Sequence, residues 1–276
     1  MIVAYDGTDF RGFASNPGVR TVGGVLSAAI ERVLGDPVDI TCAGRTDKGV
    51  HARGQVVSFD ADRERFDPEG LQRALNRLCA PEIAVRQVVA VPDGFDARRS
   101  AQSRLYRYAI LNQGAPDPFL ARTAWHVGSS LDLAALRQGS YPLIGEHDFA
   151  SFCRRPKPAG KVRGAHPGVD DSGAAHAVLQ PSASLVRRVI DASWSAHGSL
   201  LEFDIRANSF CQQMVRSIVG TLVEVGTGKR SAAEVSAILR SGDRQSVTLI
   251  APPHGLCLMS VEYPHRFAAE VSPEQH

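Results

Sequence analysis

Residues 43–54 read AGRTDKGVHARG and connect two segments, 38–43 and 55–60, that have the pattern of β-strands. Glycine adopts backbone conformations that are closed to other residues, and aspartate bonds nearby backbone amides, so both are typical of turns. A turn alone does not require an arginine, a lysine and a histidine as well. The stretch is therefore either an Asx-type turn or a loop that carries chemistry, and the rest of the chain must distinguish the two.

Helix and strand patterns alternate on both sides of this loop. Residues 21–34 have apolar side chains at helical spacing and candidate caps at both ends. Asp67 and Pro68 begin a second helix, and Ser231 begins another with a capping box. A long helix is predicted from about residue 209 to 225. The predicted strands, besides the two that flank the loop, are 2–5, 83–91, 104–111, 199–206 and 256–263.

Each half of the chain thus combines strands and helices, which predicts an α+β pattern that occurs twice. We expect the first half at residues 1–102, with the loop, and the second half at residues 103–267. The segment 155–184 is rich in proline, glycine, alanine and serine, and this composition predicts a flexible insertion in the second half. Residues 268–276 are expected to form a frayed tail.

The composition is that of a globular protein without a membrane span. The chain has 276 residues, of which 43% are hydrophobic and 22% charged. No apolar run approaches the roughly 18 residues of a transmembrane helix, and no secretory signal is apparent at the start. The five cysteines are widely spaced and form no CxxC pair, so we expect neither a disulfide framework nor a zinc ribbon. These features predict a protein of a reducing compartment, the cytoplasm.

The charge of the chain says little about its partners. The net charge is only +2, which does not by itself indicate a nucleic-acid partner. Only four of the 31 basic residues are lysines. Arginine suits phosphate contacts and stacking on bases, but a GC-rich genome accounts for the same excess.

Several common catalytic signatures are missing. GTGKR at 226–230 ends like a phosphate-binding loop, but it lacks the leading glycine and follows a helix. No GxSxG, HExxH or dinucleotide-binding pattern occurs, so we expect neither a metal nor a cofactor. Cys42 and His51 suggest a Cys/His nucleophile, but Cys42 alternates with Ile40 as a buried strand residue does, and buried thiols are inert. Any chemistry should therefore depend on the charged side chains of the loop.

The segment GRTDKGVHARGQVVSFD, residues 44–60, closely resembles the signature of the tRNA pseudouridine synthase A family. Lys48 is a departure, since alanine commonly follows the family's catalytic aspartate. Further blocks resemble segments of the same family, occur in the same order and span nearly the whole chain: YDGTDFRGF (5–13), LNRL (75–78), DARRSAQSRLYRY (96–108), GEHDFASF (145–152), SFCQQMVRSIVGTLVEVGTG (209–228) and APPHGL (251–256).

The resemblance implies the pseudouridine synthase fold, with two ferredoxin-like halves, mixed or antiparallel sheets flanked by helices, and a catalytic cleft between the halves. It implies isomerisation of uridine to pseudouridine in tRNA, in which the N-glycosidic bond breaks and the base rejoins through C5. No cofactor is needed, because nothing is oxidised or hydrolysed. Asp47 matches the family's catalytic aspartate, which acts as a nucleophile at C1′ or as a base that produces a glycal intermediate.

Three further residues match substrate-binding positions of the family. Arg216 is implied to pair with Asp47 and keep it ionised; the alternative is a surface arginine on an amphipathic helix. Tyr106 is implied to stack on the target base; the alternative is a core tyrosine, a role for which Tyr108 is the better candidate. Arg45 is implied to fill the space that the uridine leaves when it turns out of the helical stack.

The resemblance also implies a homodimer that binds tRNA and modifies nucleotides 38 to 40 of the anticodon stem-loop. Proteins read RNA shape mainly through phosphates and 2′-hydroxyls. Two other functions remain open: a tRNA-binding or folding protein without catalysis, and a cofactor-free glycosidase that uses Asp47 and Glu146. Candidate phosphate contacts, each of which could equally be a solvated surface charge, are Arg98, Arg99, Arg104, Arg107, Arg154 and Arg155.

Overall fold

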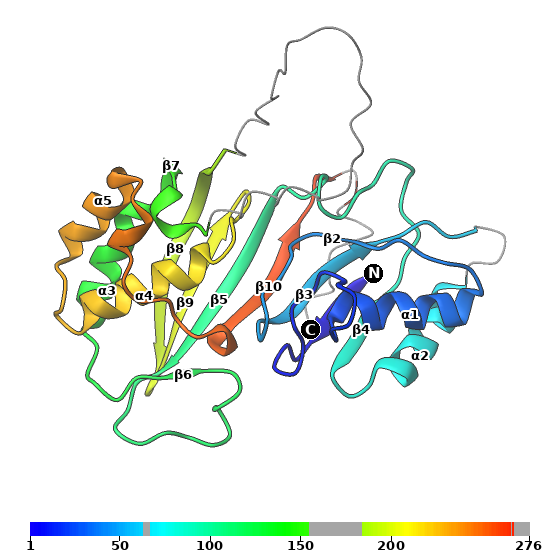
Figure 1. Ribbon diagram of the computed structural model, residues 1–276, viewed down its shortest axis with the longest axis horizontal. Coiled ribbons are helices and arrows are strands. Elements are labelled where there is room, and N and C mark those ends of the chain that lie inside the picture. The colour runs from blue at the N-terminus through cyan, green and yellow to red at the C-terminus, as the bar shows by residue number, and fades with distance from the viewer. Residues whose placement is uncertain (63–66, 155–183, 266, 268–276) are drawn as a thin grey trace, which may run out of the picture.

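The computed structural model describes residues 1–62, 67–154, 184–265 and 267 (Figure 1). The predicted tail at 268–276 and all but the last residue of the predicted insertion at 155–184 lie outside these residues. The helices are α1 (Val22–Leu34), α2 (Pro68–Cys79), α3 (Leu133–Ser140), α4 (Met214–Gly226) and α5 (Ala232–Ser241). The strands are β1 (Ile2–Tyr5), β2 (Thr41–Cys42), β3 (His51–Ser58), β4 (Ile83–Gln87), β5 (Ser103–Leu111), β6 (Trp125–His126), β7 (Gly145–Asp148), β8 (Val186–His197), β9 (Leu200–Ala207) and β10 (Leu256–Glu262).

The strands form one mixed sheet that runs through the whole molecule. Its order is β4-β1-β3-β10-β5-β9-β8-β7, with β2 paired to β3 and β6 paired to β5. β10 comes last among these strands in the chain but lies in the middle of the sheet, parallel to β3 and antiparallel to β5. The predicted α+β fold with a mixed sheet flanked by helices is thereby confirmed. The division of the chain at residue 102 stays a prediction.

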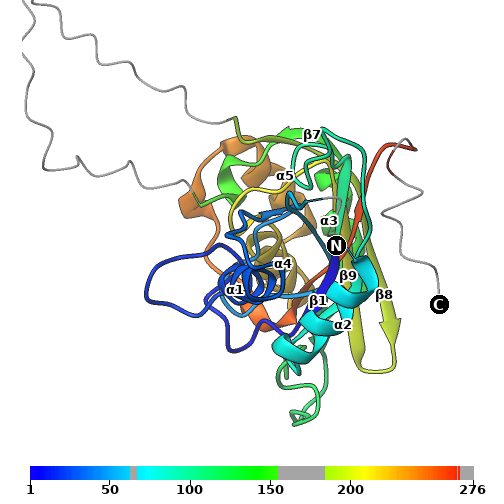
Figure 2. The same ribbon diagram turned by 90° about the vertical axis from the view of Figure 1, so that its right-hand side faces the viewer.

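The helices lie in two groups beside this sheet. In Figure 1, α1 and α2 accompany β1, β3 and β4, and α3, α4 and α5 accompany β7, β8 and β9. Figure 2 shows α1, α4 and α5 on the same side of the strands. The core that joins helix to sheet includes Ile205 and Phe203 of β9 and Ile218 and Leu222 of α4, each at most 1% exposed. No helix in the described ranges is long and apolar enough to cross a membrane.

Helices with clear caps begin where the sequence predicts. Thr21 caps α1 by accepting a bond from the amide of Gly24, Asp67 does the same for α2, and Ser231 closes the predicted capping box of α5. α4 begins at Met214 instead of near residue 209, because Gln213 has a left-handed backbone with φ of 65°. Of the predicted strand at 38–43, only Thr41–Cys42 forms a strand, which pairs with β3.

The structure contains one disulfide that the cysteine spacing does not predict. Cys153, which follows the 3₁₀ turn η2 (Ala150–Phe152), forms a disulfide with Cys211, with a Cα–Cα distance of 5.6 Å. The two residues are 58 positions apart, so no short spacing signals the pair. Cys42, Cys79 and Cys257 are free.

Candidate active site

The loop at 43–50 is anchored at its start by a buried glutamine. Gln55 is fully buried on β3; its side-chain oxygen accepts a bond of 3.2 Å from the amide of Gly44, and its amide group donates one of 2.6 Å to the carbonyl of Gly44. Further along, the Thr46 hydroxyl lies 2.8 Å from the hydroxyl of Tyr5 on β1. These hydrogen bonds tie the loop to two strands of the sheet and so hold its backbone in place.

A second segment, residues 7–13, packs against the same loop. The amide of Phe13 donates to the carbonyl of Thr46 at 3.1 Å. Gly12 has φ of +101°, and a Cβ there would lie 2.8 Å from that carbonyl oxygen. A Cβ at Gly7 would lie 1.9 Å from the carbonyl oxygen of Val50. Two glycines of the YDGTDFRGF block thus permit a backbone approach that no other residue allows.

Asp47 faces Arg216, which lies in the first turn of α4. The Oδ2 atom of Asp47 and the Nη1 atom of Arg216 are 3.6 Å apart, and the two side chains are 29% and 15% exposed. Arg216 is itself held, because its Nε donates to the carbonyl of Ala251 at 2.7 Å and its own carbonyl accepts from the amide of Ala251 at 3.0 Å. A fixed cation thus lies opposite the carboxylate, at a distance too long for a hydrogen bond.

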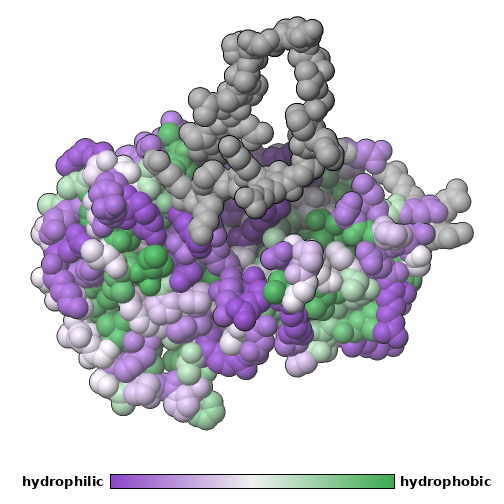
Figure 3. Space-filling model, in the orientation of Figure 1, coloured by the Kyte–Doolittle hydropathy of each residue, from purple (hydrophilic) through white to green (hydrophobic). Residues whose placement is uncertain are grey.

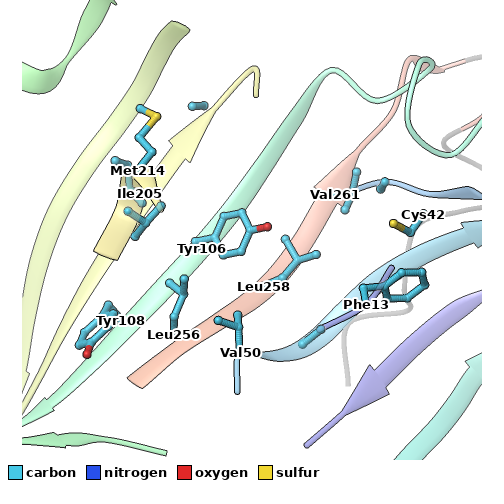
Figure 4. Packing of buried hydrophobic residues seen from close by; sticks show 14 of the residues in the cluster. Phe13, Cys42, Val50, Tyr106, Tyr108, Ile205, Met214, Leu256, Leu258 and Val261 are labelled. Atoms are coloured by element: carbon cyan, nitrogen blue, oxygen red, sulfur yellow. The ribbon is translucent and has the colours of Figure 1, made fainter. Parts of the chain in front are cut away.

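Tyr106 lies on β5 beside this pair. Its ring is 7% exposed and meets the ring of Phe210 edge to face, with centroids 5.0 Å apart. Figure 4 shows Tyr106 between Met214 on one side and Leu258 on the other. Burial raises the pKa of the Tyr106 phenol, so the group stays protonated near neutral pH. Within the described residues its hydroxyl has no hydrogen-bond partner, whereas the Tyr108 hydroxyl donates to the carbonyl of Pro252 at 2.8 Å.

These residues line one cleft of about 1020 Å³ between the α1 side and the α4 side of the molecule. Figure 3 shows hydrophilic residues gathered in the middle of this face. Asp47 is the one acidic residue among the described residues of the lining. The basic residues of the lining are Arg11, Arg45, Lys48, Arg98, Arg104, Arg154, Arg187 and Arg216. The cleft is therefore strongly cationic, although the whole chain carries only +2.

All four residues that the resemblance selected, Asp47, Tyr106, Arg45 and Arg216, thus line the same cleft. Arg45 is exposed, in the loop with Asp47. Of the other candidate phosphate contacts, Arg107 forms ion pairs of 2.9 Å with Glu202 and 2.7 Å with Asp204. Among the rest, Arg98, Arg104 and Arg154 line the cleft, Arg99 is exposed outside the lining, and Arg155 lies outside the described residues.

Two other candidate groups do not join the site. Burial raises the pKa of the Cys42 thiol to about 11, so this thiol is a poor nucleophile. The Nδ1 of His51 accepts from the amide of Gly7 at 3.1 Å, and its Nε2 then donates to the carbonyls of Arg122 and His254 at 2.9 and 3.1 Å. His51 is thus a buried structural link between distant loops.

Glu146, the second carboxylate of the glycosidase hypothesis, lies on β7 at the edge of the sheet. It is exposed and is absent from the described lining of the cleft.

Sequence patterns missed two residues of the site. Phe210 falls within the helix predicted from about residue 209, but it lies before α4 and packs on Tyr106. Gln55 was part of a strand pattern, with nothing to signal that its side chain would hold Gly44.

The chain is similar to known proteins along most of its length. A family model described as tRNA pseudouridine synthase matches residues 1–98 and 164–264. The tRNA pseudouridine synthase A of Halalkalibacterium halodurans is 40% identical over 92% of this chain and 88% of its own length. The proteins of the same name from Brevibacillus brevis and Citrifermentans bemidjiense are 40% and 37% identical, each over 95% of this chain and over 98% and 96% of their own.

Proposed function

Because this chain belongs to the tRNA pseudouridine synthase family, we propose that it isomerises uridine to pseudouridine at nucleotides 38 to 40 in the anticodon stem-loop of tRNA. The observation that carries this proposal is the Asp47 carboxylate opposite Arg216 in a cleft whose other charged residues, within the described lining, are basic. The basic residues attract the RNA backbone, and the Asp47 carboxylate is available for chemistry at the sugar.

Asp47 is the proposed catalytic residue. As a nucleophile it attacks C1′ of the uridine and displaces the base; as a base it removes the C2′ proton and leaves a glycal. In either route the N-glycosidic bond breaks, the uracil turns, C5 bonds to C1′, and the C5 hydrogen leaves as a proton. Formation of the C5–C1′ bond releases the Asp47 carboxylate from C1′ in the first route, and C2′ of the glycal takes back a proton in the second. Arg216 supports this role because its fixed cation forms an ion pair with the carboxylate.

Tyr106 and Arg45 are proposed substrate-binding residues. The uridine must leave the helical stack to reach Asp47, at a cost of a few kcal/mol. Tyr106 offers an aromatic surface and a free, protonated hydroxyl to the uracil, since burial raises its pKa. Arg45 is exposed beside Asp47 and has the planar guanidinium that stacks in the vacated space.

The test uses tRNA tritiated at uridine C5 and follows tritium release. We expect the wild-type protein to release tritium and Asp47→Asn, which keeps the shape of the side chain, to release none while still binding tRNA. Turnover that survives intact in Asp47→Asn or Asp47→Ala contradicts the assignment.

Two alternatives give different products. A tRNA-binding or folding protein without catalysis would bind tRNA and leave no pseudouridine detectable by mass spectrometry. A glycosidase would release free uracil. Asp47 argues against the first, because a carboxylate among cations does not favour phosphate binding. The position of Glu146 outside the described lining argues against the second.

The homodimer and the cytoplasmic location are also proposals. Both rest on the resemblance to the tRNA pseudouridine synthase A family and on the tRNA substrate that it implies. Sedimentation equilibrium should give twice the mass of the chain, and fractionated cells should contain the protein with the tRNA pool. A monomeric mass at micromolar concentration contradicts the dimer.

A further inference from the structure

Arg104 is a buried arginine whose hydrogen bonds are all made to backbone. It is the second residue of β5 and is 7% exposed. Its Nε and Nη2 donate to the carbonyl of Ala43 at 3.3 and 3.0 Å, and Nη2 also donates to the carbonyl of Arg98 at 2.8 Å. Its Nη1 donates to the carbonyls of Asn208 at 2.7 Å and Ala101 at 3.3 Å. The five donors of the guanidinium are therefore all used.

This cation forms no ion pair within the described part of the chain. A buried charge without a counterion is costly, because burial removes the water that would solvate it. In keeping with this, burial lowers the pKa of Arg104. Carbonyl dipoles take the place of the counterion, and an apolar residue at this position would avoid the cost. The reason for a buried arginine here must therefore lie in the four chain segments whose carbonyls it binds.

The four carbonyls come from segments that are far apart in the chain but meet at the cleft. Ala43 opens the loop that carries Asp47. Asn208 follows β9 and leads directly into the segment that holds Phe210 on the opposite wall. The other two belong to the turn between β4 and β5, and Arg98 itself lines the cleft. The Arg104 guanidinium thus sets the distance between the Asp47 loop and the Phe210 segment that faces it.

We propose that Arg104 is a positioning residue, whose guanidinium locks the Asp47 loop to the Phe210 segment and so fixes the geometry in which the uridine is held. This inference rests on the proposed function. It assigns Arg104 no contact with RNA, unlike the phosphate-contact role considered from the sequence. A lysine keeps the charge but has only three donors on a single nitrogen, so it cannot bridge the same four carbonyls.

Arg107 provides a matched control on the same strand. It is three residues from Arg104 and is bound to Asp204 and Glu202, which lie outside the described lining of the cleft. The substitutions Arg104→Lys and Arg107→Lys make the same chemical change to two arginines of β5. Each variant is compared with wild type for kcat at saturating tRNA, Kd for tRNA, thermal unfolding, and amide hydrogen exchange of residues 43–50 and 208–213.

We expect Arg104→Lys to lower kcat by between about 10-fold and about 100-fold, the effect of a small misplacement of a catalytic group. Its Kd for tRNA should stay within about threefold of wild type, and exchange in both segments should accelerate. Arg107→Lys should leave kcat and both exchange rates unchanged. Equal losses of kcat in the two variants, or wild-type kcat in Arg104→Lys, overturn the proposal, as does a change confined to Kd.

The exchange measurement separates this inference from the proposed function. If wild-type protein releases no tritium from any tRNA, the proposed activity fails. Exchange in residues 43–50 and 208–213 still decides whether Arg104 joins the two segments: acceleration in Arg104→Lys alone supports it, and identical rates in all three proteins refute it.

Discussion

Asp47 and Arg216 form an ion pair but are too far apart, at 3.6 Å, to share a hydrogen bond. The carboxylate oxygens thus remain available to a substrate, while the cation is kept in place from behind by the carbonyl of Ala251. In this arrangement the position of the Arg216 charge matters for catalysis as much as its presence.

Replacing Arg216 by lysine tests this point. The ammonium keeps the charge, but it cannot donate to Ala251 and lie opposite Asp47 in the same fixed geometry. We expect Arg216→Lys to lower kcat for tritium release by about 100-fold, in the range seen when one aligned charged donor is lost, with little change in thermal stability. A kcat within about twofold of wild type would show that charge alone is sufficient.

Lys48 follows Asp47 but does not pair with it; within the described residues, the ion pair of Asp47 is with Arg216. Its side chain is exposed in the cationic lining of the cleft, a position suited to a phosphate. We expect Lys48→Ala to weaken tRNA binding and to reduce the slope of log K against log salt by about 1, as the loss of one phosphate contact does. The kcat at saturating tRNA should be unchanged.

Lys229 provides the control for this experiment. It is exposed just after α4 and is not part of the described lining. Lys229→Ala should bind tRNA with the wild-type salt slope. If both variants change the slope equally, Lys48 has no particular place in binding.

A site residue could be predicted from the sequence only where neighbouring residues in the chain indicate its role. Asp47 stood out because charge in a glycine-rich loop is unusual. Tyr106 and Arg216 were identified through the family resemblance, since alternation and helical spacing equally suited a core tyrosine and a surface arginine. Phe210 and Gln55 were missed because their roles depend on partners elsewhere in the chain. Such contacts produce no regular residue spacing in the sequence.

At the scale of elements, α4 carries Arg216 and must lie very close to the segment before β10. A Cβ at Gly220 would lie 2.1 Å from the carbonyl oxygen of Leu249, two residues before Ala251. Gly220→Ala should therefore displace the backbone that holds Arg216, with a loss of about 1 to 3 kcal/mol in unfolding free energy and a lower kcat. Urea denaturation and tritium release measure the two effects.

Gly114 is the matched control, because a Cβ there meets nothing within 4 Å and its φ is not positive. Gly114→Ala should leave stability within about 0.5 kcal/mol of wild type and activity unchanged. Equal behaviour of the two variants would mean that the contact between α4 and residue 249 does not support the site.

Helices and strands could be predicted where their own residues show caps or a regular apolar pattern. Caps and apolar stripes located α1, α2 and α5, because those features satisfy each helix's own backbone. β8 was not predicted; much of it is exposed, so its side chains do not alternate between core and solvent as β9 does. The start of α4 was predicted too early because the left-handed residue before it is Gln213. A glycine at that position would have indicated the break.

At the scale of the whole molecule, the His51 side chain connects β3 to the turn before the neighbouring strand β10. The Nε2 of His51 on β3 donates to the carbonyl of His254 in the 3₁₀ turn η4 (Pro253–Gly255), which immediately precedes β10. Burial lowers the pKa of the His254 side chain below its usual 6.5; a hydrogen bond with the backbone of Ala124 opposes this effect, and the charge of Arg216 adds to it. Protonation of His254 thus disfavours the folded state.

This shift predicts how stability depends on pH. The unfolded chain binds the proton at a higher pH than the folded one, so the contribution is complete above about pH 6.5 and is lost as the pH falls below it. We expect the unfolding free energy of wild type to decline between pH 6.5 and 5 more steeply than that of His254→Gln. Urea titrations across this range measure both, and parallel curves would remove His254 as a cause.

The order of strands in the sheet was beyond the reach of the sequence. Alternation predicted most of the strands that surround the cleft, but side-chain pattern does not say which strand pairs with which. In particular, nothing in residues 256–262 indicates that they lie between β3 and β5.

That central position of β10 has a consequence for synthesis on the ribosome. The chain emerges from its N-terminus and folds as it does so, so the strands of β4-β1-β3 and of β5-β9-β8-β7 all exist before β10 does. Until residue 262 has emerged, β3 and β5 lack the neighbour that joins them. A nascent chain that stalls before residue 256 therefore contains Asp47, Tyr106 and Arg216 without the strand that brings them together. Translation itself thus sets the moment at which the site is assembled.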